Sequence, residues 1–256
     1  MAWFADLGYQ TAFGPDILDE RGDVTEVILW KRFEAALGRI NPGIPAPLLN
    51  QAIRQFKRSL TEEADQIRCN RQFQTMLIEG IPIQQREGAS TKTVIVKLVD
   101  RYNPDANDWL AVNQVEVWNE SNHRIPDIVV YLNGLPISVF ELKTFANEEV
   151  YLVNGFKQLQ TYKKEIPQLF LTNEILVASN GQFARIGSLT AGWDRFMPWR
   201  VLEGPEDAPE QYMMELDYCG EKLDNCMNKV YEFIKDYDVA VATKQLVSKS
   251  YPPQTY

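Results

Sequence analysis

The 256-residue sequence lacks long apolar runs and has little cysteine and histidine. No segment approaches the roughly 18 uncharged apolar residues of a membrane-spanning helix. The first residues also lack the basic flank of a signal peptide. We therefore expect a cytoplasmic protein that does not enter a membrane.

The sequence contains few residues that could support thiol or zinc chemistry. Cys69, Cys219 and Cys226 are an odd number of cysteines without metal-ligand spacing, and His123 is the single histidine. The sequence also contains no Gly-x-x-x-x-Gly-Lys-Ser/Thr phosphate loop. These absences argue against a zinc site, a cysteine nucleophile and ATP binding through such a loop.

Positive charge is in deficit. The chain has 26 lysines and arginines against 35 aspartates and glutamates, giving a net charge of −9. Such a balance argues against a protein that holds nucleic acid by bulk electrostatic attraction alone. A chain of this charge could bind nucleic acid only through a local basic rim, a bound metal or partner subunits.

What the sequence does contain is an ordinary globular composition, with 45% apolar and 24% charged residues. Within it, residues 126–143 form two apolar, β-branched runs around Asn133-Gly134. This dipeptide is a strong hairpin signal because both residues tolerate positive φ. Three charged side chains interrupt the runs, namely Asp127, Glu141 and Lys143. Charges in such strands are costly unless they share a task.

The register of this hairpin decides whether the three charges meet. Side-chain alternation places Glu141 and Lys143 on one face, with Leu142 pointing into the core and its carbonyl at the rim. A plain two-residue turn would pair Asp127 with the residue before Glu141 and send its carboxylate to the wrong face. We therefore predict one extra residue, either in a three-residue loop that includes Leu135 or in a bulge between the turn and the site.

Two carboxylates, a backbone carbonyl and waters make an all-oxygen shell suited to Mg²⁺, with Asp127 and Glu141 as the candidate ligands. An aspartate preceded by Pro126, followed on the next strand by Glu-x-Lys, resembles the PD-(D/E)xK nuclease signature. From the residues alone, a solvated edge is the competing interpretation. Glu26 or Glu34, in a predicted upstream helix, could add a carboxylate, although a solvated helix charge is the commoner role.

The rest of the chain predicts an α/β protein in which an antiparallel meander leads into the hairpin. Residues 1–22 are expected to be irregular. Helices are predicted over 24–39, from Pro47 to about residue 60, over 62–79 with Gly80 as C-cap, and over 147–165 with Asn147 as N-cap. Strands are predicted over 81–85, 93–100, 109–118, 169–172, 175–178 and 182–189. A long helix is predicted beyond an acidic linker at 203–210.

The 147–165 helix carries further candidate residues. Gln158 and Tyr162 are four apart and so share one face, which must pack back across the sheet near the hairpin. The alternative is that Tyr162 packs in the core and Gln158 lies at the surface. Lys157, Lys163 and Lys164 form a basic cluster on the same helix, either solvated or in contact with phosphates.

With these segments laid out, the sequence resembles the nuclease domain of the restriction (motor) subunit of type I restriction-modification enzymes. The likeness extends from about Gly8 to Trp199. It rests, in chain order, on Asn70-Arg-Gln-Phe73, Val112-Asn-Gln-Val115, Arg124-Ile-Pro-Asp127-Ile-Val, Asn133-Gly-Leu-Pro-Ile, Glu141-Leu-Lys143, Gln158-Leu-Gln-Thr-Tyr162, Ala184-Arg-Ile-Gly-Ser-Leu-Thr190 and Arg195-Phe-Met-Pro-Trp199.

The resemblance implies a restriction-endonuclease-like core, with a mixed central sheet and a catalytic hairpin flanked by helices. It implies cleavage of double-stranded DNA with Mg²⁺, with Asp127 and Glu141 as metal ligands. Lys143 would orient the attacking water or stabilise the developing charge. Gln158 and Tyr162 would form a Gln-x-x-x-Tyr motif that contacts DNA or positions the lysine.

In that family an ATP-driven motor follows the nuclease domain, and separate methyltransferase and specificity subunits complete the complex. On this interpretation residues 1–202 are the endonuclease domain. Residues 203–256 are a linker and a C-terminal helix leading to an absent motor, so that only the full-length subunit would bind ATP.

Two alternatives stay open. One is a non-catalytic DNA-binding or motor-docking module with a nuclease-like fold. The other is a metal-dependent nuclease of the repair or phage-recombination kind. The presence of all three hairpin charges speaks against a dead site, because a scaffold would gain stability from apolar residues there.

Overall fold

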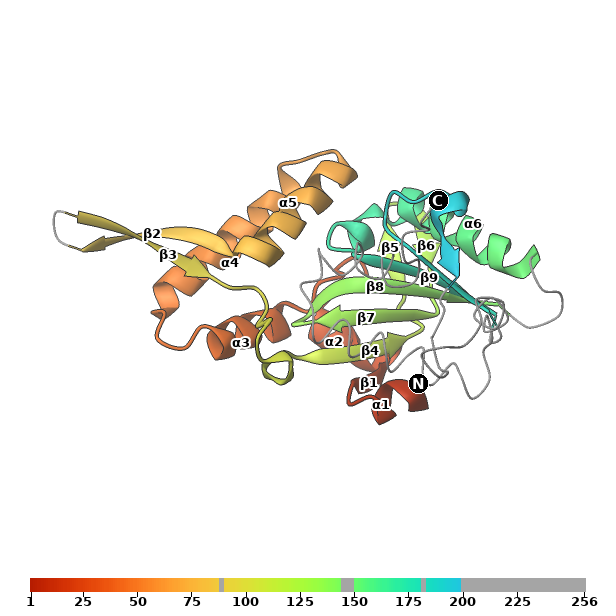
Figure 1. The fold of residues 1–256 in the computed structure, drawn as a ribbon, viewed down its shortest axis with the longest axis horizontal. Helices are drawn as coiled ribbons and strands as arrows, with labels where there is room; N and C mark the ends of the chain where they lie inside the picture. Colours follow the sequence, from red (N-terminus) through yellow and green to blue (C-terminus); the bar gives the residue numbers. More distant parts are fainter. Residues whose placement is uncertain (88–89, 144–149, 181–182, 199–256) are drawn as a thin grey trace, which may run out of the picture.

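In the computed structural model the described residues are 1–87, 90–143, 150–180 and 183–198. They form a seven-stranded mixed sheet with strand order β1-β4-β7-β8-β9-β10-β11, and the two-stranded ribbons β2-β3 and β5-β6. Figure 1 shows α3, α4 and α5 gathered on one side, with the β2-β3 ribbon extending from them, while α6 lies by the other end of the sheet. The predicted α/β fold, a mixed central sheet flanked by helices, is confirmed.

The bounds of the elements are as follows. The large sheet contains β1 (Gln10–Phe13), β4 (Trp109–Asn113), β7 (Ile128–Leu132), β8 (Leu135–Leu142), β9 (Ile175–Ser179), β10 (Ala184–Gly187) and β11 (Met197–Pro198). The ribbons are β2 (Ile81–Glu87) with β3 (Ser90–Val96), and β5 (Val117–Asn119) with β6 (Asn122–Arg124). The helices are α1 (Ala2–Asp6), α2 (Leu18–Arg21), α3 (Trp30–Ile40), α4 (Ala46–Thr61), α5 (Gln66–Glu79) and α6 (Val150–Glu165). Single 3-10 turns are η1 (Gly14–Ile17), η2 (Pro104–Ala106), η3 (Pro167–Phe170) and η4 (Trp193–Arg195).

The β7-β8 hairpin is the centre of the sheet. Its turn holds Asn133 and Gly134, with φ of 52° and 80°, as a tight two-residue turn requires. β4 pairs antiparallel with β7 on one side, and β9 pairs parallel with β8 on the other. The parallel pairing follows from α6, which carries the chain back across the sheet between β8 and β9.

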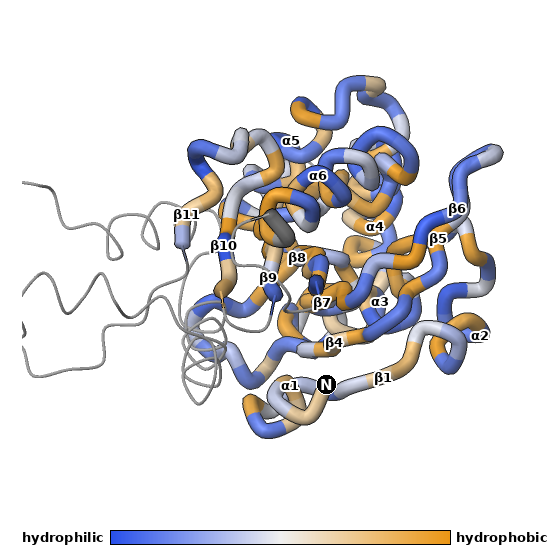
Figure 2. The backbone as a smooth tube through the Cα atoms, turned by 90° about the vertical axis from the view of Figure 1, so that its right-hand side faces the viewer, coloured by the Kyte–Doolittle hydropathy of each residue, from blue (hydrophilic) through white to orange (hydrophobic). Residues whose placement is uncertain are grey.

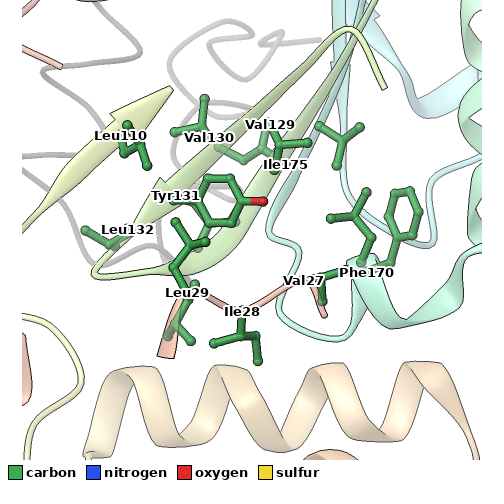
Figure 3. Packing of buried hydrophobic residues seen from close by; sticks show 14 of the residues in the cluster. Val27, Ile28, Leu29, Leu110, Val129, Val130, Tyr131, Leu132, Phe170 and Ile175 are labelled. Carbon is green, nitrogen blue, oxygen red and sulfur yellow. The ribbon is translucent and has the colours of Figure 1, made fainter. Parts of the chain in front are cut away.

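The core lies on both faces of this hairpin. All five residues of β7 are buried, as are those of β9, which is typical of central strands covered on both sides. Figure 3 shows Leu29 beside Tyr131, whose side chain is fully buried, and Ile28 pointing toward the neighbouring helix. Burial raises the pKa of the Tyr131 hydroxyl, which therefore stays neutral. Hydrophilic residues dominate the outlying β6 instead (Figure 2).

The N-terminal region was wrongly predicted. Residues 1–22 are not irregular but form α1, β1 and α2, and β1 pairs parallel with β4 at the sheet edge. Most side chains of this four-residue strand are exposed, so it shows no alternation that a sequence pattern could reveal. The helix predicted over 24–39 begins only at Trp30. The preceding residues form turns and bends, and Leu29 N–H donates to the carbonyl of Gly134 at 2.9 Å.

The predicted meander is also incorrect in part. β2 and β3 pair with each other and leave the large sheet, and the strand predicted over 109–118 breaks at Gln114, which has a φ of 56°. Residues 167–170 form η3 where a strand was expected. The third helix starts at Gln66 because the Asp65 carboxylate caps it, and Gly80 ends it with a φ of 76°, as predicted.

Some expectations fall outside the described residues, including the Asn147 cap, the 203–210 linker and the helix beyond it. Among the helices that the structure describes, none is long and apolar enough to cross a membrane.

Candidate active site

A bulge in β8 sets the register of the site. On the turn side of the hairpin Tyr131 pairs with Pro136, whereas on the far side Val130 pairs with Ser138. Ile137 is therefore the extra residue. One additional residue in one strand shifts every later side chain by one position relative to the partner strand.

This shift brings the two acids together. Beyond the bulge Ile128 pairs with Phe140, and the same register one residue further places Asp127 opposite Glu141. The Oδ2 atom of Asp127 accepts the Leu142 N–H at 2.7 Å, which ties the first strand to the second at this point. The bulge alternative is confirmed, and the three-residue loop is not formed because the turn contains only Asn133-Gly134.

A continuous chain of hydrogen bonds joins β8 to α6. The Lys143 ammonium donates to Glu141 Oε1 at 2.5 Å and to Gln158 Oε1 at 2.6 Å. The Gln158 Nε2 group in turn donates to the Tyr162 hydroxyl at 2.5 Å. The five candidate residues, Asp127 included, thus lie together at one end of the sheet.

A glycine permits this close approach of the helix to the strand. A Cβ atom at Gly155 would lie 3.3 Å from Ala178 Cβ, 3.7 Å from Lys143 Cγ and 3.8 Å from Glu141 Cγ. A larger side chain would push α6 away and stretch the bond from Lys143 to Gln158. The sequence signal for such packing is a lone glycine inside a helical pattern.

Burial dominates the electrostatics of the site. Glu141 and Tyr162 each have only 2% of their surface exposed. Burial raises the pKa of Glu141, and the nearby Asp127 raises it further, while the bond from Lys143 opposes both effects. Burial likewise raises the pKa of Tyr162, which keeps its hydroxyl protonated. Tyr162 therefore packs in the core and belongs to the site at once.

One oxygen of this carboxylate is left without an aligned donor. Glu141 Oε2 is buried and accepts no well-aligned hydrogen bond from the described residues, although the Tyr162 hydroxyl is near enough to lower the carboxyl pKa. A buried carboxylate oxygen in this state is costly. A cation shared with Asp127 would relieve that cost, so the donor set fits a hard metal ion.

The donor set also limits which metal fits. In the part of the chain that the structure describes, no group of three or more His, Cys, Asp or Glu side chains has a metal-holding arrangement. An ion at Asp127 and Glu141 would therefore keep much of its water. Mg²⁺ commonly binds in this way, whereas structural zinc demands four side chains.

Gln114 is a neighbour of the site that sequence reasoning missed. Its N–H donates to the Asp127 carbonyl at 3.0 Å, and its Nε2 donates to Asp127 Oδ1 at 3.3 Å. Its backbone is held in the left-handed region, with Gly14 packed so closely that a Cβ there would lie 2.0 Å from the Gln114 carbonyl oxygen. Such backbone geometry in a non-glycine residue leaves no sequence signal.

The upstream glutamates are not brought to the site. The Glu26 carboxylate accepts the N–H groups of Val27 and Ile28 and the indole N–H of Trp30. Glu34 is exposed on α3. Neither residue is among the groups that influence the Glu141 carboxyl.

Two further expectations need correction. Leu142 does not point into the core, because 44% of its surface is exposed. In the basic cluster, Lys163 donates to the Leu189 carbonyl at 2.7 Å, and burial lowers its pKa. Lys157 and Lys164 remain exposed on α6.

The fold and the site together define a restriction-endonuclease-like core that carries an acidic pair and a lysine on its central hairpin. Comparison with known families gives the particular assignment. The chain belongs to the family described as type I restriction enzyme R protein N terminus, whose model matches residues 1–195.

Two relatives illustrate the match. The chain is 34% identical over 212 residues to the type I restriction enzyme HindI endonuclease subunit of Haemophilus influenzae, covering 80% of this chain and 20% of that protein. It is 33% identical over 225 residues to the putative type I restriction enzyme MjaIXP endonuclease subunit of Methanocaldococcus jannaschii, covering 85% and 21% respectively. The chain thus spans about a fifth of the length of these relatives.

The raised pKa of Glu141 predicts a pH-dependent stability. The folded state favours the protonated Glu141 carboxyl, so ionisation of this group lowers the free energy of unfolding. This loss is absent below the carboxyl's usual pKa of about 4.3 and is complete above the raised pKa of the folded state. In EDTA at pH 8, Glu141→Gln should therefore unfold at a higher temperature than the wild type, and the advantage should shrink toward pH 4. Circular dichroism melts measure the difference, since a change of 1 kcal/mol in the free energy of unfolding shifts Tm by about 2–4 °C in a protein of this size.

Glu34→Gln is the matched control because its carboxylate is exposed, and it should melt like the wild type at both pH values. A Glu141→Gln variant less stable than the wild type at pH 8 would contradict a burial penalty on this carboxylate.

The packing at Gly155 can be tested with a pair of helix glycines. Gly38 in α3 has nothing within 4 Å of an added Cβ, so Gly38→Ala should stabilise the protein by about 0.5–1 kcal/mol. Gly155→Ala should gain less because of its 3.3 Å contact. Gly155→Leu should lower the free energy of unfolding by about 1–3 kcal/mol. Urea denaturation measures all three, and equal gains at both glycines would show that α6 is not tightly seated.

Proposed function

We propose that this chain is the Mg²⁺-dependent endonuclease domain of a type I restriction subunit and hydrolyses phosphodiester bonds in double-stranded DNA. The observation that carries the proposal is the juxtaposition of Asp127, Glu141 and Lys143 by the β8 bulge, in a chain of this family. The names of the two relatives describe endonuclease subunits, which supports the same activity here.

Asp127 and Glu141 would hold the metal. Their carboxylates lie on opposing strands in register, and the Leu142 carbonyl between Glu141 and Lys143 can add a third oxygen. Bound there, Mg²⁺ would acidify a water ligand and neutralise charge on the scissile phosphate. The hydrogen bonds from Leu142 N–H and Gln114 to Asp127 restrain its carboxylate before any ion arrives.

Lys143 would supply the fixed positive charge beside the reacting phosphate. Its ammonium has three donors, and two of them are satisfied by Glu141 and Gln158. The third can point toward a water or a phosphate oxygen. Lys143 would thereby orient the attacking water and stabilise charge as the water adds to phosphorus and the P–O bond breaks.

Gln158 and Tyr162 would act by positioning the lysine. The Tyr162 hydroxyl accepts from Gln158 Nε2, which leaves Gln158 Oε1 directed at Lys143. Tyr162 is itself fixed by its burial in the core. This arrangement favours the lysine-positioning role of the pair over direct contact with DNA.

The remaining parts of the enzyme would lie outside this chain. We propose that residues 1–202 are the endonuclease domain and that 203–256 lead toward an ATP-driven motor in the full-length subunit. Methyltransferase and specificity subunits would then join through that subunit and select the DNA. Such partners would add to the modest affinity for DNA that a chain of net charge −9 can have.

Loss of either Asp127 or Lys143 should abolish cleavage. In the assembled enzyme, Asp127→Ala and Lys143→Ala should each reduce nicking and cleavage of a supercoiled plasmid by at least about 100-fold, since the first removes a metal ligand and the second removes the positive charge beside the reacting phosphate. Agarose gels measure the products, and ATP hydrolysis by the same complexes reports that assembly is intact. Glu34→Ala should cut normally, and cleavage by either site variant at the wild-type rate would end the assignment.

A further inference from the structure

Charge is unevenly distributed along this acidic chain. Residues 30–101 contain 12 lysines and arginines and 7 aspartates and glutamates, a net charge of +5. Since the whole chain carries −9, the remaining residues carry −14. The basic segment is α3, α4, α5 and the β2-β3 ribbon, which lie together on one side of the molecule, with the ribbon pointing away from the large sheet (Figure 1).

The β2-β3 ribbon presents one exposed face, called here the ribbon face. Its members alternate along both strands and stand opposite each other in register, Pro82 with Ile95, Gln84 with Thr93 and Arg86 with Thr91, and all six are exposed. The inner face is different, because Ile81, Ile83 and Val96 are buried in the core cluster and β2 packs against α4. None of the six residues of the ribbon face is acidic.

The base of the ribbon continues this character. Lys97 is exposed directly after β3, and its Nζ lies 6.0 Å from the ring centroid of Tyr102, whose surface is 87% exposed. Both residues line a hollow together with Arg101. Of the residues lining this hollow, all of which lie in the described ranges, Glu79 alone carries a carboxylate.

We propose that the ribbon face, together with Lys97 at its base, contacts the sugar-phosphate backbone of duplex DNA. This inference rests on the proposed function, since it assigns the surface that holds the same substrate. Lysine, arginine, threonine and glutamine are the side chains that donate to phosphate oxygens. A two-stranded ribbon is also narrow enough to follow a groove of B-DNA. An apolar protein partner fits less well, because Pro82 and Ile95 are the sole apolar members of the face.

The ribbon face and the active site lie at opposite ends of the central hairpin. The Asn133-Gly134 turn is tied to the base of the ribbon, where Asn133 Nδ2 donates to the Leu98 carbonyl at 2.9 Å. Asp127 and Glu141 are at the other end of β8, whose eight residues span about 26 Å. A duplex that touches both places must therefore extend over at least about 8 base pairs, and a probe of about 24 base pairs gives two full helical turns.

The test is fluorescence anisotropy of this labelled duplex with the full 256-residue chain, titrated at several salt concentrations in EDTA to prevent cleavage. Lys97→Glu and Arg86→Glu should each weaken binding roughly five- to tenfold at 0.1 M salt and reduce the slope of log K against log salt by about 1. Both residues are exposed, and thermal melts verify that the variants remain folded.

Arg54→Glu is the matched control. Arg54 is exposed on α4, the helix that covers the inner face of the ribbon, so this variant has the same net charge without altering the ribbon face. It should bind like the wild type. Equal losses of affinity in all three variants would show that net charge alone is responsible and would overturn the inference. Unchanged affinity in the ribbon variants, or no binding by the wild type, would also overturn it. Unchanged duplex binding with weakened binding of poly-glutamate would instead assign the face to an acidic protein.

The two proposals fail separately. Cleavage by the assembled enzyme that depends on Asp127 while the ribbon variants bind DNA normally would refute the ribbon face alone. If the ribbon variants weaken DNA binding but Asp127→Ala leaves cleavage unchanged, the proposed active site alone would be refuted.

Discussion

A single extra residue in β8 is the constraint on which this molecule depends. Because side chains alternate along a strand, the bulge at Ile137 moves Glu141 into register with Asp127. Without it the aspartate would pair with Phe140 and face away from the glutamate. The hairpin turn itself is an ordinary Asn-Gly turn, so the correction must be made within the strand. The bulge therefore positions the acidic pair, although it lies several residues from either acid.

The helix α6 completes what the bulge begins. Gly155 lets the helix lie against β8, and Gln158, which donates to the Tyr162 hydroxyl, then accepts from the lysine that directly follows the strand. The cost is a glutamate with almost no exposed surface and an elevated pKa. Replacing a buried charged cluster by apolar residues usually stabilises a fold. The presence of the charged cluster here is consistent with a chemical role. Lys143 satisfies only one of the two Glu141 oxygens, and the other is left without an aligned donor.

Much of this site could be predicted from the sequence, for physical reasons. The Asn-Gly pair predicts the hairpin turn, and the alternation of side chains along a strand predicts the face on which each residue lies. Because a plain turn would put Asp127 on the opposite face from Glu141, an extra residue is required. The bulge position was not predicted, although Pro136, directly before the extra residue, cannot donate to a strand ladder and is found in sheets mainly at edges and bulges. Gln114 was missed since its left-handed backbone depends on tertiary contact with Gly14. The edge strand β1 was missed because its few residues are mostly exposed, and Leu142 was misplaced because alternation says nothing about which elements cover a strand end.

The assignment of an ion to Asp127 and Glu141 is the central claim, and binding of Mg²⁺ to the full 256-residue chain tests it most directly. Isothermal titration of the wild type and of Asp127→Asn separates a shared site from adventitious surface binding, because the substitution removes one charge and keeps the shape. The claim predicts one saturable site in the wild type and at least about a tenfold weaker affinity in the variant, or about 1.4 kcal/mol. Identical titrations of the two proteins would contradict it.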